Sequence, residues 1–297
     1  MTIITQRLFF LHDLSQQGRN TYVVFSTDLD EKLSKRLALK NALQDAIRGN
    51  QLHLNYQPQV DQTGQFCGLE ALVRWQHPIK GLISPVDFIP IAEETGQIIQ
   101  LGRWVAMQAC QDAQKLLHMN LLQGRMALNL SPLQVHRPEF LQSLQETLEQ
   151  TGIPPKHLEL ELTEGILLRN TEVTIDTLKT LHAMGIDTSI DDFGTGYSSF
   201  SYLKDLPVER VKIDKVFIDK ITNDSRDAAV CKGIINMPGE LGIKVVAEGV
   251  ETREQFELLK SFGCEAFQGY YFAKPMPFDD LVKWILARQK QTGASTD

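Results

Sequence analysis

The sequence predicts an α/β fold, a TIM-type (β/α)8 barrel in which the first strand runs antiparallel to the others. Three observations support this prediction. The chain has 297 residues, little more than the roughly 250 of a typical barrel of this kind. Short β-rich segments alternate with longer helical patterns from residue 52 onward. From the third β-rich segment on, successive segments begin roughly 22 to 35 residues apart, which is the spacing of βα units.

Eight β-rich segments are expected to form the strands. Only DQTG, at residues 61–64, separates the first two, and this sequence is typical of a hairpin turn. A crossover helix does not fit there, so the first strand should be reversed. In order, the segments are LHLNYQPQV (52–60), GLEALVRW (68–75), RMALNLS (125–131), HLELELTE (157–164), GIDTSIDDFG (185–194), RVKID (210–214), IKVVAEGVE (243–251) and EAFQGYYFAKP (265–275).

Three stretches between or after these segments have clear helical patterns. Residues 86–119 carry apolar side chains at helical spacing and should form two helices. Residues 252–263 begin with a Thr cap and stop at Gly. Residues 277–290 place Leu281, Trp284 and Ile285 on one face, which predicts a helix that packs against the barrel.

The ends of the chain differ from the barrel region. Residues 1–40 are expected to be an N-terminal segment and linker, with a strand-like TYVVF at 21–25 followed by a charged amphipathic helix. The barrel is expected to span residues 41–288. The polar residues 289–297 should form a disordered tail.

Composition excludes several classes of protein. No stretch approaches the roughly 18 apolar residues of a membrane span, and LFFL at 8–11 is too short for a signal peptide, so a cytoplasmic protein is expected. A net charge of −7 argues against binding of a nucleic-acid polymer. The four Cys residues lack the spacing of a zinc site and should be inert thiols.

Acid, amide and lysine side chains occupy the later half of one β-rich segment after another. The carboxyl ends of parallel barrel strands carry the chemistry of this fold, so these side chains should meet at one mouth. They are Glu70, Asn129, Glu161, Glu164, Asp191, Asp192, Lys212, Asp214, Glu248, Glu251 and Gln268.

Converging carboxylates repel one another unless cations neutralise them. Oxygen ligands without His or Cys favour Mg²⁺ or Mn²⁺. The adjacent Asp191 and Asp192 suit a pair of cations of the kind that cleaves phosphoesters. Each residue also has a simpler interpretation, such as an ion pair of Glu70 with Arg74 or a helix cap at Asn129. Their occurrence in order at successive strand ends favours one shared site.

Seven motifs resemble the motif series of the bacterial EAL-domain phosphodiesterases, over about residues 41–288. They are LEALVRW (69–75), LNLSP (128–132), LELTE (160–164), DDFGTGYSSF (191–200), VKID (211–214), VVAEGVET (245–252) and QGYYFAKP (268–275). The resemblance implies a barrel with one antiparallel strand that hydrolyses cyclic di-GMP to linear pGpG. It also implies two Mg²⁺ or Mn²⁺ ions per site, with Ca²⁺ inhibitory.

The resemblance assigns roles to individual residues. One metal would be held by Glu70, Asn129, Glu161 and Asp191, and the second by Asp191, Asp192 and Glu248. The catalytic set would be Lys212, which orients the attacking water, Glu251 and Gln268, which support the network, and Glu164, which holds the loop after the Asp pair. The substrate contacts would be Gln57, Leu72, Arg74, Asp214 and Pro275.

Two alternatives stay open. Some family members bind cyclic di-GMP as receptors without cleaving it, usually after losing metal ligands or the loop after the Asp pair, and this sequence shows no such loss. Another metal-dependent barrel hydrolase is the third possibility.

The one departure from the family in the loop after the Asp pair is Phe200, where Leu is common. The resemblance further implies a homodimer formed beside this loop, and GRNTYVVF (18–25) resembles the closing strand of a GGDEF domain.

Overall fold

The computed structural model describes residues 27–168, 171–195 and 203–293. In this part of the chain, eight strands close a barrel and a short ninth strand, β3 (Gly81–Ile83), pairs with the end of β2 alone. The barrel strands are β1 (Leu52–Asp61), β2 (Phe66–His77), β4 (Arg125–Leu130), β5 (Leu158–Thr163), β6 (Asp187–Phe193), β7 (Arg210–Ile213), β8 (Lys244–Ala247) and β9 (Ala266–Phe267).

The predicted reversal of the first strand is confirmed. Strand β1 pairs antiparallel with both β2 and β9, whereas the other neighbours from β2 round to β9 pair in parallel. The hairpin tip has the expected turn chemistry, since Asp61 Oδ1 accepts hydrogen bonds from the backbone of Thr63 and Gln65, and Gly64 adopts a φ of 81°. No separate signal for the three-residue β3 was found in the sequence pattern.

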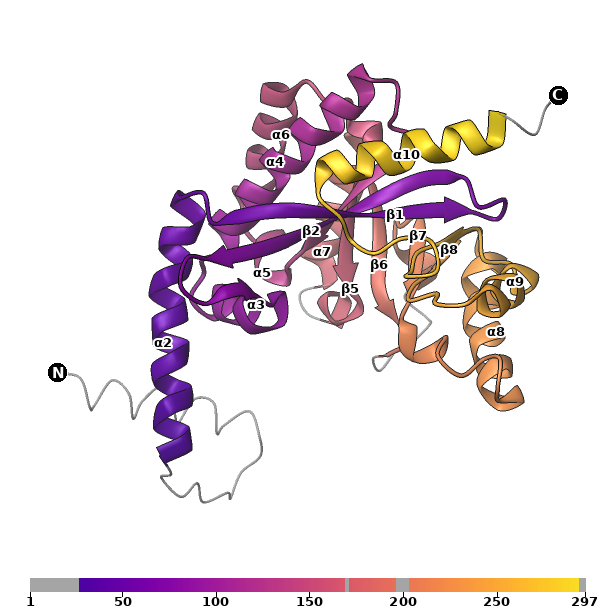
Figure 1. The fold of residues 1–297 in the computed structure, drawn as a ribbon, viewed down its shortest axis with the longest axis horizontal. Helices are drawn as coiled ribbons and strands as arrows, with labels where there is room; N and C mark the ends of the chain where they lie inside the picture. Colours follow the sequence, from indigo (N-terminus) through magenta and orange to yellow (C-terminus); the bar gives the residue numbers. More distant parts are fainter. Residues whose placement is uncertain (1–26, 169–170, 196–202, 294–297) are drawn as a thin grey trace.

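Helices cover the outside of the barrel (Figure 1). Residues 86–119 form two helices as predicted, and the helix over 253–262 has Thr252 and Gly263 as its caps. The described part of the β6–β7 connection holds only η3, a 3-10 turn. The α-helices after β3 are α3 (Pro85–Glu94), α4 (Ile98–His118), α5 (Pro132–Val135), α6 (Phe140–Thr151), α7 (Thr171–Ala183), α8 (Ser225–Glu240), α9 (Arg253–Phe262) and α10 (Phe278–Gly293), and the 3-10 helices are η1 (Pro155–His157), η2 (Glu164–Leu168), η3 (Leu203–Asp205) and η4 (Lys215–Phe217).

Both ends of the described chain are helical. The linker helix α2 (Thr27–Arg48) runs past residue 40, the expected boundary, and buries Leu43 in a core that it shares with Trp75 and Phe88. Helix α10 lies along β1 and continues through residues 289–293, which were expected to belong to the tail. The strand expected at residues 21–25 and the last residues of the tail lie outside the described residues.

The apolar core lies between the barrel strands and the helices that cover them. Inside the barrel, polar side chains also lie below the mouth, where Glu159 pairs with Arg210. One continuous cluster of buried side chains joins the strands to the helices that cover them, and Leu281 and Ile285 of α10 belong to it as predicted. All four Cys residues are free thiols. In the described part of the chain, the helices include none with the length and apolar character needed to span a membrane. The polar side chains at the carboxyl ends of the strands form the site described below.

Candidate functional site

The ammonium of Lys212 lies at the centre of the site. Strand β7 carries this lysine, whose side chain is only 1% exposed. Its Nζ lies among carboxylates from β2, β5, β6 and the residue that follows β8. The distances are 2.6 Å to Glu161 Oε2, 2.6 Å to Glu248 Oε1, 3.4 Å to Asp191 Oδ1 and 3.7 Å to Glu70 Oε2. The structure thus brings together side chains from four strands and from the residue after a fifth.

Amide side chains complete this cluster on the side of β1 and β2. Glu70 accepts hydrogen bonds from Asn129 Nδ2 and from Gln268 Nε2, each at 2.6 Å. Gln268 also donates to Gln57 Oε1 and accepts from Gln59 Nε2. The sequence interpretation missed Gln59, although its position two residues after Gln57 puts both on the same face of β1.

The arrangement leaves the site short of positive charge. Four carboxylates and one ammonium amount to three formal negative charges in a buried space. Burial raises the pKa of Glu161 and of Glu248 above the usual value, and the neighbouring carboxylates raise both further against the effect of Lys212. Burial would also raise the pKa of Glu70, but Lys212 and the two amide hydrogen bonds outweigh it and lower that pKa.

A bulge lets both residues of the Asp pair reach the mouth. Successive side chains of a regular strand point to opposite faces. The pairing of β6 with β7 shifts register between Ile190 and Phe193, and Asp192 adopts a φ of 54°, in the left-handed region that few residues other than Gly adopt. Burial, followed by the charges of Asp191 and Asp214 and a hydrogen bond with Asp214, raises the pKa of Asp192 to about 6.

Glu164 is in a position to hold the loop after β6. Its side chain is buried at the start of η2, and Oε2 accepts a hydrogen bond of 3.1 Å from the backbone of Gly194. The contact joins the end of β5 to the first turn after β6. Residues 196–202, which include Phe200 and the expected dimer region, lie outside the described residues.

Glu251 lies apart from the central cluster. Its exposed carboxylate pairs with Lys215 of η4, so the structure places it at the outer rim and gives it no contact with Lys212. The turn that precedes it is tight, because Gly269 packs directly on the backbone of Val250. Asp214 is the cap of η4, and its Oδ1 accepts a hydrogen bond from the backbone of Val216.

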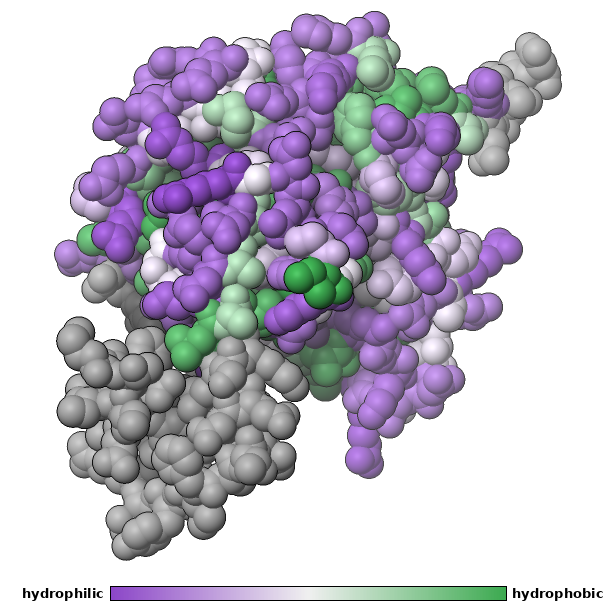
Figure 2. Space-filling view, turned by 60° about the vertical axis from the view of Figure 1, so that its left-hand side comes forward, coloured by the Kyte–Doolittle hydropathy of each residue, from purple (hydrophilic) through white to green (hydrophobic). Residues whose placement is uncertain are grey.

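A groove of about 670 Å³ opens beside the cluster. Leu72, Arg74, Asn129 and both residues of the Asp pair lie along it, opposite apolar side chains of α3 and α4. Val86 of α3 is 81% exposed at its edge, and Figure 2 shows only small hydrophobic areas on an otherwise hydrophilic face.

Three of the expected substrate contacts, Gln57, Asp214 and Pro275, lie outside the lining of this groove. Gln57 is buried, and its Nε2 donates to the carbonyl of Ala273. Pro275 is half-buried, next to Met276, which pairs with Tyr56 of β1.

The side chains of the cluster are of the kind that binds divalent cations, although in this structure they surround the ammonium of Lys212. Glu161 Oε1 is buried without a hydrogen-bond partner, and the surrounding donors are carboxylate and amide oxygens, as Mg²⁺ and Mn²⁺ prefer. Among residues 27–168, 171–195 and 203–293, no three Asp, Glu, His or Cys side chains already have the arrangement of a metal site. Lys212 Nζ occupies the space between the carboxylates.

Comparison with known proteins identifies the relatives of this barrel. The EAL domain family matches residues 40–275. The bifunctional diguanylate cyclase/cyclic di-GMP phosphodiesterase MucR of Pseudomonas aeruginosa is 41% identical over 273 residues, which are 92% of this chain and 40% of MucR. The cyclic di-GMP phosphodiesterase NbdA of the same organism is 41% identical over 278 residues, covering 93% of this chain and 36% of NbdA. The chain thus spans about two fifths or less of these two relatives.

A solved structure gives the same result. The PaMucR phosphodiesterase in complex with c-di-GMP matches with a TM-score of 0.79 and 43% identity, over 82% of this chain and 99% of that one. The motifs, the closed barrel with its reversed first strand and these matches agree with one another, and the chain belongs to the EAL domain family.

Proposed function

We propose that this chain is a metal-dependent phosphodiesterase that hydrolyses cyclic di-GMP to linear pGpG. The observation that carries the proposal is the cluster of four carboxylates and an amide around Lys212 at the carboxyl ends of the strands. A buried excess of negative charge is costly for stability, and a binding site for cations accounts for it. The relatives named as phosphodiesterases support the choice of substrate.

The metal ligands in this proposal are Glu70, Asn129, Glu161, Asp191, Asp192 and Glu248. Bound Mg²⁺ or Mn²⁺ supplies charge neutralisation at the phosphodiester and makes the attacking water more acidic. In the groove beside the cluster, the guanidinium of Arg74 can bind a substrate phosphate, and the apolar wall can pack against a base.

Lys212 keeps a positive charge next to the reacting groups. Burial alone would lower its pKa, but the surrounding carboxylates raise the pKa well above the usual value, so the amine stays protonated. From this position the ammonium can donate a hydrogen bond to the attacking water, which orients the water and favours its hydroxide form. Glu164 keeps the turn at Gly194 in place, and Gln268 keeps Glu70 oriented.

The test is incubation of the purified protein with cyclic di-GMP and Mg²⁺ or Mn²⁺, with a chelator control and chromatographic detection of pGpG. Asp191→Asn should abolish product formation while the unfolding temperature stays close to that of the original protein, because it removes one charged oxygen at the site. Asp187→Asn is the matched control, since Asp187 lies at the other end of the same strand and pairs with Arg125.

The outcome also separates the enzyme from the alternatives. Binding of cyclic di-GMP without any pGpG, in either metal, would refute hydrolysis and leave the receptor function. Full turnover by Asp191→Asn would contradict the assignment of the metal ligands. Hydrolysis of unrelated phosphodiesters in preference to cyclic di-GMP would instead indicate a different metal-dependent hydrolase.

A further inference from the structure

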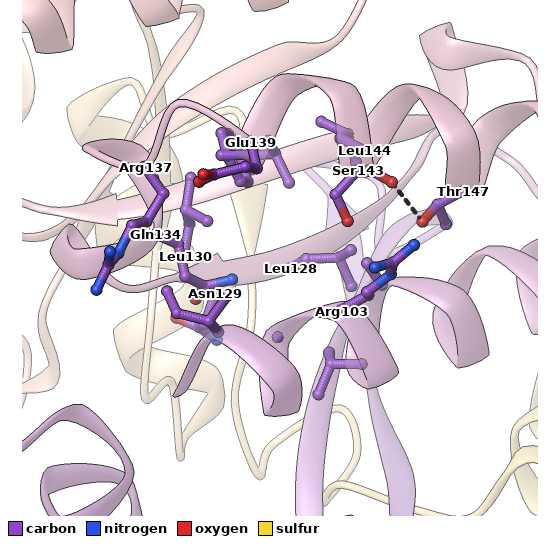
Figure 3. A pocket seen from close by; sticks show the side chains of 16 residues that line it. Arg103, Leu128, Asn129, Leu130, Gln134, Arg137, Glu139, Ser143, Leu144 and Thr147 are labelled. Carbon is purple, nitrogen blue, oxygen red and sulfur yellow. Dashed lines mark hydrogen bonds between the residues drawn. The ribbon is translucent and has the colours of Figure 1, made fainter. Parts of the chain in front are cut away.

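The end of strand β4 lies beside a cavity under the helices that cover it. Asn129 points into the mouth, where it donates to Glu70, so its neighbours Leu128 and Leu130 point to the opposite face. Both leucines line a cavity of about 140 Å³ between β4, α4 and α6, and Figure 3 shows them between Arg103 and Gln134. Side chains that face a cavity lose part of their van der Waals contact. Leu128 and Leu130 stay buried in the apolar core, and Asn129 also borders this cavity.

Polar contacts also hold the chain just beyond β4. Ser131, two residues after Asn129, is the cap of α5, and its Oγ donates a hydrogen bond of 2.7 Å to Glu93 Oε1 of α3. Its backbone N–H donates to the side-chain Oε1 of Gln134 at 3.1 Å. Both hydrogen bonds hold Ser131, the first residue after β4.

Gln134 is itself held by close packing. Its side chain is buried and lies directly on Gly102 of α4, where a Cβ would overlap the amide Nε2. Gln134 also lines both the cavity and the groove, so it forms part of the wall between the two. A side chain at position 102 would force the Gln134 amide to shift from this position.

We propose that Glu93 and Gln134 are positioning residues, which fix Ser131 and thereby hold Asn129 in contact with Glu70. This inference rests on the proposed function insofar as Asn129 acts as a ligand in that site. Helix α3 also contacts the linker helix α2, because Glu94, next to Glu93, pairs with Arg36. Helix α3 therefore connects α2 to the site.

The first measurement does not depend on activity. The side-chain amide of Asn129, assigned in ¹H–¹⁵N spectra by comparison with Asn129→Asp, should exchange its hydrogens about tenfold faster in Glu93→Ala, in line with the loss of a hydrogen bond to a charged group. Glu93→Gln keeps an acceptor for Ser131 and should restore slow exchange. Gly102→Ala should resemble Glu93→Ala, because the new methyl group displaces Gln134.

Glu94→Ala is the matched control, since Glu94 lies on the same helix and contacts Arg36 instead of Ser131. It should leave the exchange of the Asn129 amide unchanged. Equal exchange rates in Glu93→Ala and Glu94→Ala would overturn the proposal. So would faster exchange throughout the backbone amides of β5, because that result indicates general loosening of the barrel.

The second measurement is a double-mutant cycle on the affinity for Mn²⁺, by calorimetry. If Glu93 acts through Asn129, Glu93→Ala weakens binding in the original protein and has no further effect in Asn129→Ala. An equal loss in both backgrounds would refute the positioning role. A protein that holds Asn129 as proposed but never forms pGpG would refute the proposed function alone.

Discussion

Lys212 should contribute strongly to the stability of the metal-free protein. Removal of one partner from a buried ion pair typically costs about 3–5 kcal/mol, because the other charge is left uncompensated. Here one ammonium serves four carboxylates, two of them at 2.6 Å. Protonation of Glu161 or Glu248, whose pKa values burial already raises, offsets part of the loss. We therefore expect Lys212→Met to lower the free energy of unfolding by about 3 kcal/mol, near the lower end of that range.

The assay is urea unfolding in the presence of a chelator, followed by circular dichroism. Lys215→Met is the matched control, because Lys215 is an exposed lysine that pairs with carboxylates at the rim, and its loss should change the midpoint little. Added Mn²⁺ should restore more stability to Lys212→Met than to the original protein, since cations supply the missing charge. If Lys212→Met and Lys215→Met unfold at the same urea concentration, Lys212 does not balance the cluster as argued.

Three further predictions follow from individual contacts. Ca²⁺ added to the Mn²⁺-dependent reaction should slow pGpG formation, because its longer bonds suit a compact site poorly, and unchanged rates would contradict this. Gly269→Ala should weaken metal binding measured by calorimetry. The new methyl group would meet the backbone of Val250, whose N–H donates a hydrogen bond to the carbonyl of Gln268. Equal affinity would show that the turn can adjust. Leu43→Ala should cost about 2–5 kcal/mol in calorimetric unfolding, since it empties the core under α2, and a negligible loss would show that α2 adds little to the barrel.

The sequence was sufficient for the fold because each strand end carries its own local signal. The turn at residues 61–64 leaves no room for a crossover, and this alone determines the reversed β1. The extent of α2 was less predictable. Nothing in the sequence stops or starts a helix at residue 40, and the burial of Leu43 against α3 is a tertiary contact that local periodicity does not reveal.

The arrangement of the side chains within the site was harder to predict than which residues form it. Spacing places Lys212 at the mouth, but its position between four carboxylates depends on the reach of a long side chain across the barrel. The bulge at Asp192 depends on the register between β6 and β7, which a single sequence does not specify. Glu251 has a strand-end position like the others, yet its side chain turns outward to Lys215 because η4 places a cation there.

In the proposed function, the cluster has to stay folded both before and after its cations bind. Carboxylates aimed at divalent ions repel one another until the ions bind, and burial strengthens that repulsion. Lys212 supplies one compensating charge from within the chain, while Asn129 and Gln268 supply hydrogen bonds to Glu70. One ammonium balances only one of the four carboxylates, so the remaining charge still favours cations. In that proposal, the same lysine stabilises the cluster before cations bind and leaves part of its negative charge to attract them.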